Sequence, residues 1–214
     1  MPGEEIPFVN ARLTLETERL RLTALTAEAL AAWMAGDADR LRDETSVSFD
    51  TPLAAPPLFD EDLPTFYRAA RRDPRALGWW AWVVSTREGG RAVGVLALCG
   101  RPMDGHAVLG YAVYPSAEGR GYATEAADAL VSWALAQPGV VAVRALVPSW
   151  NQASRSVARK LGMVEVAREL DREAGEVAVY QIPERVPRAR PTLRLGVDVA
   201  QPRIADVGQP RIGP

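Results

Sequence analysis

The segment from residue 109 to residue 162 constrains the fold of this chain more than any other part of it. A short apolar run ends at Pro115, which cannot donate to a central strand ladder. A turn with two glycines follows at 119 to 121 and leads directly into an amphipathic helical pattern at 122 to 137. Residues 140 to 147 are then mostly β-branched and apolar. The order strand, glycine turn, helix, strand predicts a crossover unit with its loop at a helix N-terminus.

The glycine turn has the features of an anion-binding site. The first turn of a helix leaves backbone N–H groups without intrahelical partners, and the helix dipole adds partial positive charge there. Gly119 and Gly121 lack the Cβ atoms that would keep a bulky anion away from those N–H groups. A phosphate or pyrophosphate is therefore the expected guest. An ordinary tight turn between strand and helix would share this spacing, and the spacing alone does not separate the two.

Two well-known phosphate loops do not fit the residues after the glycines. A dinucleotide fingerprint needs a third glycine or alanine where this chain has Thr124. A Walker A loop needs Gly-Lys-Ser/Thr, whereas Tyr122, Ala123 and Thr124 follow here. What remains is Gly-Xaa-Gly-Tyr-Ala-Thr-Glu-Ala, together with Asn-Xaa-Xaa-Ser-Xaa-Xaa-Val-Xaa-Xaa-Lys-Leu-Gly from Asn151 to Gly162.

These two segments together resemble the acetyl-coenzyme A site of the GNAT superfamily of N-acetyltransferases. The closest branch is the ribosomal-protein N-terminal acetyltransferase-like one. The superfamily's first motif, Arg/Gln-Xaa-Xaa-Gly-Xaa-Gly/Ala, falls on residues 116 to 121, where Ser116 departs from the usual Arg or Gln. Residues 16 to 22 resemble that branch's first strand, so the likeness covers roughly residues 14 to 183. It implies an acyl-CoA N-acyltransferase fold.

The patterns along the whole chain predict a mixed α/β fold of the α+β class. We expect a twisted, mostly antiparallel sheet of about six to seven strands with helices on both faces. No period holds over residues 39 to 57, which favours a plain surface loop, whereas the resemblance would place substrate-side helices and loops there. Strands are expected at 19 to 23, 79 to 86, 92 to 99, 107 to 114, 140 to 147, 163 to 170 and 176 to 182, and helices at 26 to 34, 60 to 73, 122 to 137 and after Asn151.

Three regions differ in composition. Residues 1 to 13 read as a loose N-terminal lead, residues 14 to 183 as the N-acetyltransferase (GNAT) domain, and residues 184 to 214 as a Pro- and Arg-rich C-terminal tail expected to be flexible. Within the tail, residues 192 to 200 alternate enough to pair with a sheet edge, either of the same subunit or of a neighbour. A homodimer is therefore an alternative to a monomer.

Composition excludes several classes of protein. The net charge of −2 argues against a nucleic-acid binder. No apolar run reaches the ~18 residues of a membrane span, and the first residues lack the pattern of a signal peptide, so we expect a cytoplasmic protein that does not bind a membrane. Cys99 and His106 are the only residues of their kinds, which excludes an intrachain disulfide and a Cys/His zinc cluster; no metal is expected.

The resemblance implies how acetyl-CoA is held. Two strands, one ending near Tyr114 and the other near Val147, would diverge and take the pantetheine arm between them. The Val113 N–H would also polarise the thioester carbonyl, and the diphosphate would sit on N–H groups of the glycine loop. The implied cofactor-binding residues are Val113, Glu118, Gly119, Arg120, Gly121, Tyr122, Ala123, Thr124, Asn151, Ser154 and Lys160.

Several of these residues have a second interpretation. Asn151 would cap the last helix while reaching the pantetheine. Lys160 would meet a phosphate of coenzyme A, or only compensate the helix C-terminus. Ser154 would either act in catalysis or only form a hydrogen bond at the helix N-terminus.

Acetyl transfer to an amine needs no enzyme nucleophile, because the neutral amine attacks the thioester directly. Protonated amines have pKa values near ~10, so a base or a water relay to a carboxylate is required. The tyrosine that many family members use to protonate the leaving thiolate is Ala158 here, and Ser154 is what the ribosomal branch would offer instead. The candidate bases are Glu125, Glu118 and Glu173, although the place of Glu125 in the first helical turn favours a role in stabilising the helix dipole.

Three functions are compatible with these features. The first is an acetyl-CoA-dependent N-acetyltransferase acting on a primary amine, either a protein N-terminus or a small molecule. The second is a non-catalytic acyl-CoA-binding or protein-interaction module on the same fold. The third is an unrelated nucleotide-binding α/β protein, which the missing third glycine disfavours. Residues 39 to 75 are expected to shape the acceptor pocket.

Overall fold

The structure is a computed structural model that describes residues 11 to 56, 59 to 172, 174 to 182 and 192 to 197. Its strands are β1 (Ala11–Glu16), β2 (Leu20–Ala24), β3 (Ala81–Thr86), β4 (Ala92–Leu98), β5 (His106–Val113), β6 (Ala142–Pro148), β7 (Val164–Asp171), β8 (Gly175–Gln181) and β9 (Thr192–Val197). Its helices are α1 (Ala27–Met34), α2 (Ala38–Thr45), α3 (Leu63–Arg72), α4 (Tyr122–Leu135) and α5 (Gln152–Lys160), with 3₁₀ turns η1 (Asp60–Asp62), η2 (Pro74–Ala76) and η3 (Pro115–Ala117).

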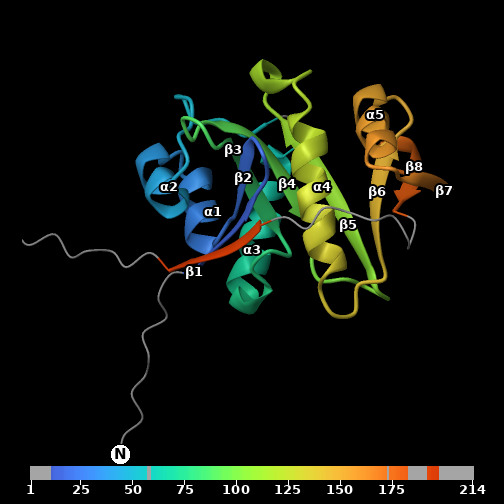
Figure 1. Cartoon of the computed structure of the whole chain (residues 1–214), viewed down its shortest axis with the longest axis horizontal. Helices are drawn as coiled ribbons and strands as arrows, with labels where there is room; N and C mark the ends of the chain where they lie inside the picture. The colour runs from blue at the N-terminus through green and yellow to red at the C-terminus, as the bar shows by residue number, and fades with distance from the viewer. Residues whose placement is uncertain (1–10, 57–58, 173, 183–191, 198–214) are drawn as a thin grey trace, which may run out of the picture.

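The strands of the described residues form one nine-stranded sheet in the order β7-β8-β6-β5-β4-β3-β2-β1-β9 (Figure 1). Every neighbouring pair is antiparallel except β5 and β6, which are parallel. A parallel pair needs a crossover, and α4 supplies it. The mixed fold with a mostly antiparallel sheet is confirmed, and the strand count exceeds the six to seven expected.

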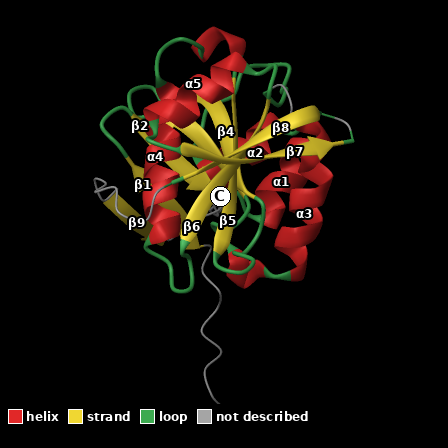
Figure 2. Ribbon diagram, turned by 90° about the vertical axis from the view of Figure 1, so that its right-hand side faces the viewer, coloured by secondary structure: helices red, strands yellow, loops and turns green. Residues whose placement is uncertain are grey.

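Helices cover both faces of the sheet (Figure 2). On one face α4 and α5 bury Leu130, Trp133 and Ala158 against the sheet, and the Trp133 ring lies 5.5 Å from that of Trp82 on β3. On the other face α1, α2 and α3 bury a second core that includes Trp33. Because packing against the sheet holds α4 and α5 on the same face, the loops at their N-termini are fixed relative to β5 and β6.

The region expected to be a loop holds a helix. α2 occupies residues 38 to 45, where only Leu41 and Thr45 are buried. Asp37 caps it by accepting from the Arg40 N–H at 2.9 Å. Two buried positions in two turns are too few to give a clear period, which is why the pattern was missed.

At both ends of the expected domain, β-strand extends beyond the expected limits. β1 begins at Ala11, inside the segment expected to be a loose lead. β9 pairs antiparallel with all of β1, from Ala11↔Val197 to Glu16↔Thr192. The edge pairing expected of residues 192 to 200 is therefore present within the chain for 192 to 197, whereas the rest of the tail lies outside the described residues. No helix in the described part of the chain is long and apolar enough to cross a bilayer.

Candidate active site

The parallel pair β5 and β6 separates after three residues. The two strands pair only at His106↔Ala142, Ala107↔Val143 and Val108↔Arg144. Beyond that point β5 keeps its partner β4 as far as Val113, and β6 keeps its partner β8. Figure 1 shows the two strands close at one end and apart at the other. The expected divergence is therefore present, and it leaves one edge of β5 from residue 109 to 113 without a strand partner among the described residues.

The glycine loop follows this unpaired edge in the chain and lies at the N-terminal end of α4. Gly119 and Gly121 have φ values of 72° and 79°, which L side chains rarely adopt. The first hydrogen bond of α4 runs from the Glu125 N–H to the Gly121 carbonyl at 3.1 Å. Within the described residues, no backbone carbonyl accepts an N–H group from 119 to 124. A run of free donors at a helix N-terminus is the chemistry that binds a diphosphate.

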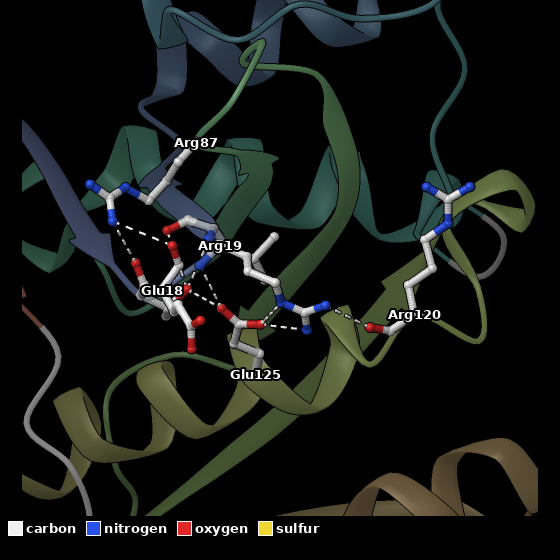
Figure 3. A network of polar contacts seen from close by, with 7 residues as sticks. Glu18, Arg19, Arg87, Arg120 and Glu125 are labelled. Carbon is white, nitrogen blue, oxygen red and sulfur yellow. Dashed lines mark hydrogen bonds and ion pairs between the residues drawn. The ribbon is translucent and has the colours of Figure 1, made fainter.

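Arg19, in the turn between β1 and β2, contacts both the loop and the helix (Figure 3). Its Nε and Nη2 lie 2.7 and 2.6 Å from Glu125 Oε2. Its Nη1 donates to the Arg120 carbonyl at 3.0 Å, and the guanidinium lies over the Tyr122 ring, 4.9 Å from the ring centroid. Sequence reasoning missed this residue, because a strand-alternating Arg carries no sign of a partner 106 positions away.

Glu125 is fully engaged in this network. Its Oε1 accepts from the Thr17 hydroxyl at 2.6 Å and from the Arg19 backbone N–H at 2.9 Å. Burial by itself would raise the pKa of Glu125, but these hydrogen bonds and the charge of Arg19 lower the pKa below its ordinary value. A carboxylate with a lowered pKa is a weak base. Glu125 as general base stays a prediction, and its surroundings favour a positioning role.

The other two candidate bases are placed differently. Glu118 is exposed where the glycine loop begins, directly after η3. Glu173 lies outside the described residues. The described residues do not include a group of three His, Cys, Asp or Glu side chains able to hold a metal ion.

The N-terminus of α5 lies beside the gap. Asn151 caps the helix, its Oδ1 accepting from the Ser154 N–H at 3.0 Å. Ser154 is half-buried, and its carbonyl accepts a hydrogen bond from the Tyr111 hydroxyl at 2.9 Å. Ala158 is fully buried in the core below α5. A larger side chain at that position would have to displace this packing.

Tyr111 joins β5 to α5 across the point where the strands diverge. It lies on the stretch of β5 that has no strand partner on the β6 side, and its hydrogen bond reaches the first turn of α5. Burial raises the pKa of Tyr111 to about 12, so its hydroxyl keeps its proton at neutral pH. Nothing in the sequence distinguished Tyr111 from an ordinary strand tyrosine.

Lys160 lies apart from Asn151. It is exposed in the last turn of α5, a helix of 9 residues, so the two are separated by roughly 13 Å along the axis. The structure therefore does not bring the two motif ends together. Lys160 does lie where a cation compensates the helix C-terminus.

The segment expected to shape the acceptor pocket reaches the end of β5. The Tyr114 hydroxyl donates to the Ala54 carbonyl at 2.8 Å. Burial, followed by the charge of Asp50, raises the pKa of Tyr114. Residues 50 to 54 therefore lie beside the strand that ends at the glycine loop.

Comparisons with known proteins agree with one another. A family model described as acetyltransferase (GNAT) domain matches residues 19–164. YjdG of Bacillus subtilis (strain 168), an uncharacterized N-acetyltransferase, is 28% identical over 152 residues, which cover 70% of this chain and 89% of that protein.

Solved structures share the fold. An acetyltransferase from Agrobacterium tumefaciens is 25% identical and has a TM-score of 0.55 over 79% of this chain and 94% of its own. RimL, a ribosomal alpha-N-protein acetyltransferase in complex with coenzyme A, is 18% identical, with a TM-score of 0.54 over 78% of this chain and 94% of its own.

Proposed function

The chain belongs to the GNAT acetyltransferase family, and from that premise we propose that it moves an acetyl group from acetyl-CoA to a primary amine. The acceptor is a protein N-terminus or a small-molecule amine. One observation supports this proposal above the others: β5 and β6 separate directly beside a loop whose N–H groups from 119 to 124 have no backbone acceptor within the described residues. The fold of RimL, which was solved with coenzyme A, agrees with it.

The coenzyme would be held mainly by backbone groups. The N–H groups from Gly119 to Thr124 would bind the diphosphate, since that loop combines open glycines with a helix N-terminus. The Glu118 N–H, also expected to take part, instead donates to the Pro115 carbonyl at 3.3 Å. The unpaired edge of β5 near Val113 would pair with the amides of the pantetheine arm, as an added strand would. Asn151 and Ser154 would complete the site from the N-terminus of α5, whereas Lys160, at the other end of that helix, would meet only a phosphate of the coenzyme.

Transfer would proceed by direct attack. The amine nitrogen forms a bond to the thioester carbon while its proton passes to a base or a water, and the carbon–sulfur bond breaks to release the coenzyme thiolate. The Val113 N–H would stabilise the oxyanion. The thiolate takes its proton from Ser154 or from water, because the buried Ala158 offers none.

The domain limits stay part of the proposal. The catalytic domain expected at 14 to 183 would begin at Ala11, because β1 belongs to its sheet, and the tail expected at 184 to 214 would follow it. The strand contributed by residues 192 to 197 would complete the edge of the domain's sheet.

A non-catalytic module on the same fold is the second candidate. Two features favour it: Ser116 replaces the Arg or Gln of the first motif, and Ala158 replaces the tyrosine. Such a module would bind acetyl-CoA without turning it over.

The test is the release of free thiol from acetyl-CoA across a panel of peptide N-termini, amino acids and polyamines, with calorimetry of acetyl-CoA, NAD and ATP beside it. We expect the protein to bind acetyl-CoA but neither NAD nor ATP, and to release thiol with at least one amine. Binding without release under all amines would favour the non-catalytic module. Preference for NAD or ATP would contradict both.

A further inference from the structure

We infer that Arg19 is a positioning residue for the diphosphate loop, fixed by Glu125 and in turn fixing the backbone of that loop in the orientation that receives the coenzyme. This inference rests on the proposed function, because it assigns the loop to acetyl-CoA. It assigns Glu125 the role of holding Arg19 in place, rather than the role of general base.

The first step is the anchor. Four donors converge on the Glu125 carboxylate: the Thr17 hydroxyl and the Arg19 backbone N–H on Oε1, and Arg19 Nε and Nη2 on Oε2. The paired guanidinium contacts are charge-assisted and directional. Because Glu125 lies in the first turn of α4, the Arg19 guanidinium is held in place relative to the helix N-terminus.

The turn that carries Arg19 is also held to the sheet. Arg87, after β3, donates through Nη1 to the Thr17 carbonyl at 3.1 Å and to the Glu18 carbonyl at 3.4 Å (Figure 3). The turn that carries Arg19 is therefore held from both sides, by Glu125 on α4 and by Arg87 after β3.

The second step is the orientation of one peptide group. Arg19 Nη1 holds the Arg120 carbonyl at 3.0 Å. In a planar trans peptide the following N–H points opposite to the carbonyl. The Gly121 N–H is therefore directed away from Arg19 and cannot rotate inward without breaking this contact. A loop with two glycines at positive φ would otherwise sample many orientations and lose that freedom when the ligand binds.

The third step concerns the residues that flank this peptide group. The guanidinium lies 4.9 Å from the centroid of the Tyr122 ring, which holds the ring at the start of α4. Its Nη2 lies 3.6 Å from where a Cβ on Gly121 would stand. A lysine would keep the charge but could not contact the carboxylate, the carbonyl and the ring together.

The experiment compares two acetyl donors. Arg19→Ala and Arg19→Lys are assayed with acetyl-CoA and with S-acetylpantetheine, which has the thioester and the amides but no diphosphate. We expect the KM for acetyl-CoA to rise about tenfold in both variants, as for loss of a charge-assisted hydrogen bond, with kcat changed by less than about twofold. The kcat/KM for S-acetylpantetheine should stay within about twofold of wild type, because that donor does not reach the loop.

Arg101→Ala is the matched control. Arg101 forms a surface ion pair with Asp73, with side chains 53% and 46% exposed, away from the glycine loop. This control should leave both donors unchanged. Thermal unfolding confirms that each variant is folded, and Arg19→Lys replaces Arg19→Ala if the alanine variant is not.

Two results would overturn the inference. An equal loss with both donors would mean that Arg19 supports the fold or the chemistry rather than the diphosphate loop, and unchanged KM for acetyl-CoA would mean that it supports nothing there. A wild-type protein that neither binds acetyl-CoA nor releases thiol would instead defeat the proposed function and the inference with it, which is a distinguishable outcome.

Discussion

At the scale of single residues, the glycine loop depends on backbone conformation rather than on space. Gly119 has a φ of 72°, yet a Cβ there would meet no atom within 4 Å. The need for glycine at this position is therefore conformational rather than steric. Gly89, in the turn between β3 and β4, also has a φ of 79° and no atom within 4 Å of a Cβ, so the need for glycine there is conformational as well.

Gly119→Ala and Gly89→Ala form a matched pair. Each should lower the free energy of unfolding by about 1 kcal/mol, the cost of a left-handed Cβ residue. Only Gly119→Ala should weaken acetyl-CoA binding, because the proposed function places the diphosphate on that loop. Urea unfolding and calorimetry measure the two effects. Equal affinity for acetyl-CoA in both variants would place the diphosphate elsewhere.

The lowered pKa of Glu125 predicts a pH dependence of stability. A carboxylate whose pKa is lower in the folded state stabilises the fold above its unfolded pKa of about 4.3, and this contribution is lost as pH falls through the folded pKa. Glu125→Gln should therefore cost about 1 kcal/mol at pH 7, a low value because Arg19 is 47% exposed and water screens the pair.

The difference between Glu125→Gln and wild type should shrink as pH falls below about 4.3. Urea unfolding at pH 7 and at lower pH measures it. Glu118→Gln, which changes an exposed carboxylate, is the control and should show little effect at either pH. A difference that grows towards low pH would contradict the assigned sign.

At the scale of elements, the site exists because β5 and β6 cease to pair while α5 stays attached to both. Tyr111 makes that attachment on the β5 side, through the Ser154 carbonyl. Packing of Ala158 into the hydrophobic core also attaches α5 to the sheet. The gap can therefore be open without α5 separating from the sheet.

Tyr111→Phe tests this attachment. Loss of the hydrogen bond should lower the free energy of unfolding by about 1 kcal/mol and raise the KM for acetyl-CoA, since α5 would no longer be fixed at the gap. Tyr67→Phe removes an exposed hydrogen bond to Arg71 on α3 and should do neither. Thermal unfolding and steady-state kinetics give both readouts. A stable variant with unchanged KM would show that α5 is held by core packing alone.

At the scale of the whole molecule, the sheet is completed by a strand from the other end of the chain. β9 pairs along all of β1 and occupies one edge of the sheet, whereas β7 occupies the other. Four strands separate β9 from β5, so this edge is remote from the divergent pair.

Deletion of residues 184 to 214 should therefore lower stability by at least about 2 kcal/mol, through loss of the β1–β9 ladder, and leave kcat within about twofold. It should also promote association, because an unpaired edge strand is a template for another chain. Deletion of residues 198 to 214 alone keeps β9 and is the control. Thermal unfolding, thiol release and size-exclusion chromatography distinguish them; equal stability of the two deletions would mean that β9 adds nothing to the fold.

The sequence by itself determined the elements whose signals are local. Backbone conformation and side-chain period act over a few residues, so the glycine turn, the helix caps at Thr26 and Asn151 and the crossover from β5 through α4 to β6 could all be predicted. The family likeness rested on the same local segments.

Only the tertiary structure decided which distant groups meet. Glu125 contacts Thr17 and Arg19 from more than a hundred positions away, and Tyr111 reaches Ser154 across 43. Whether a carboxylate acts as a base or as an anchor depends on such neighbours, since they set its pKa and occupy its oxygens. No local pattern encodes them, because they arise only when helices and sheet bury their apolar faces against each other.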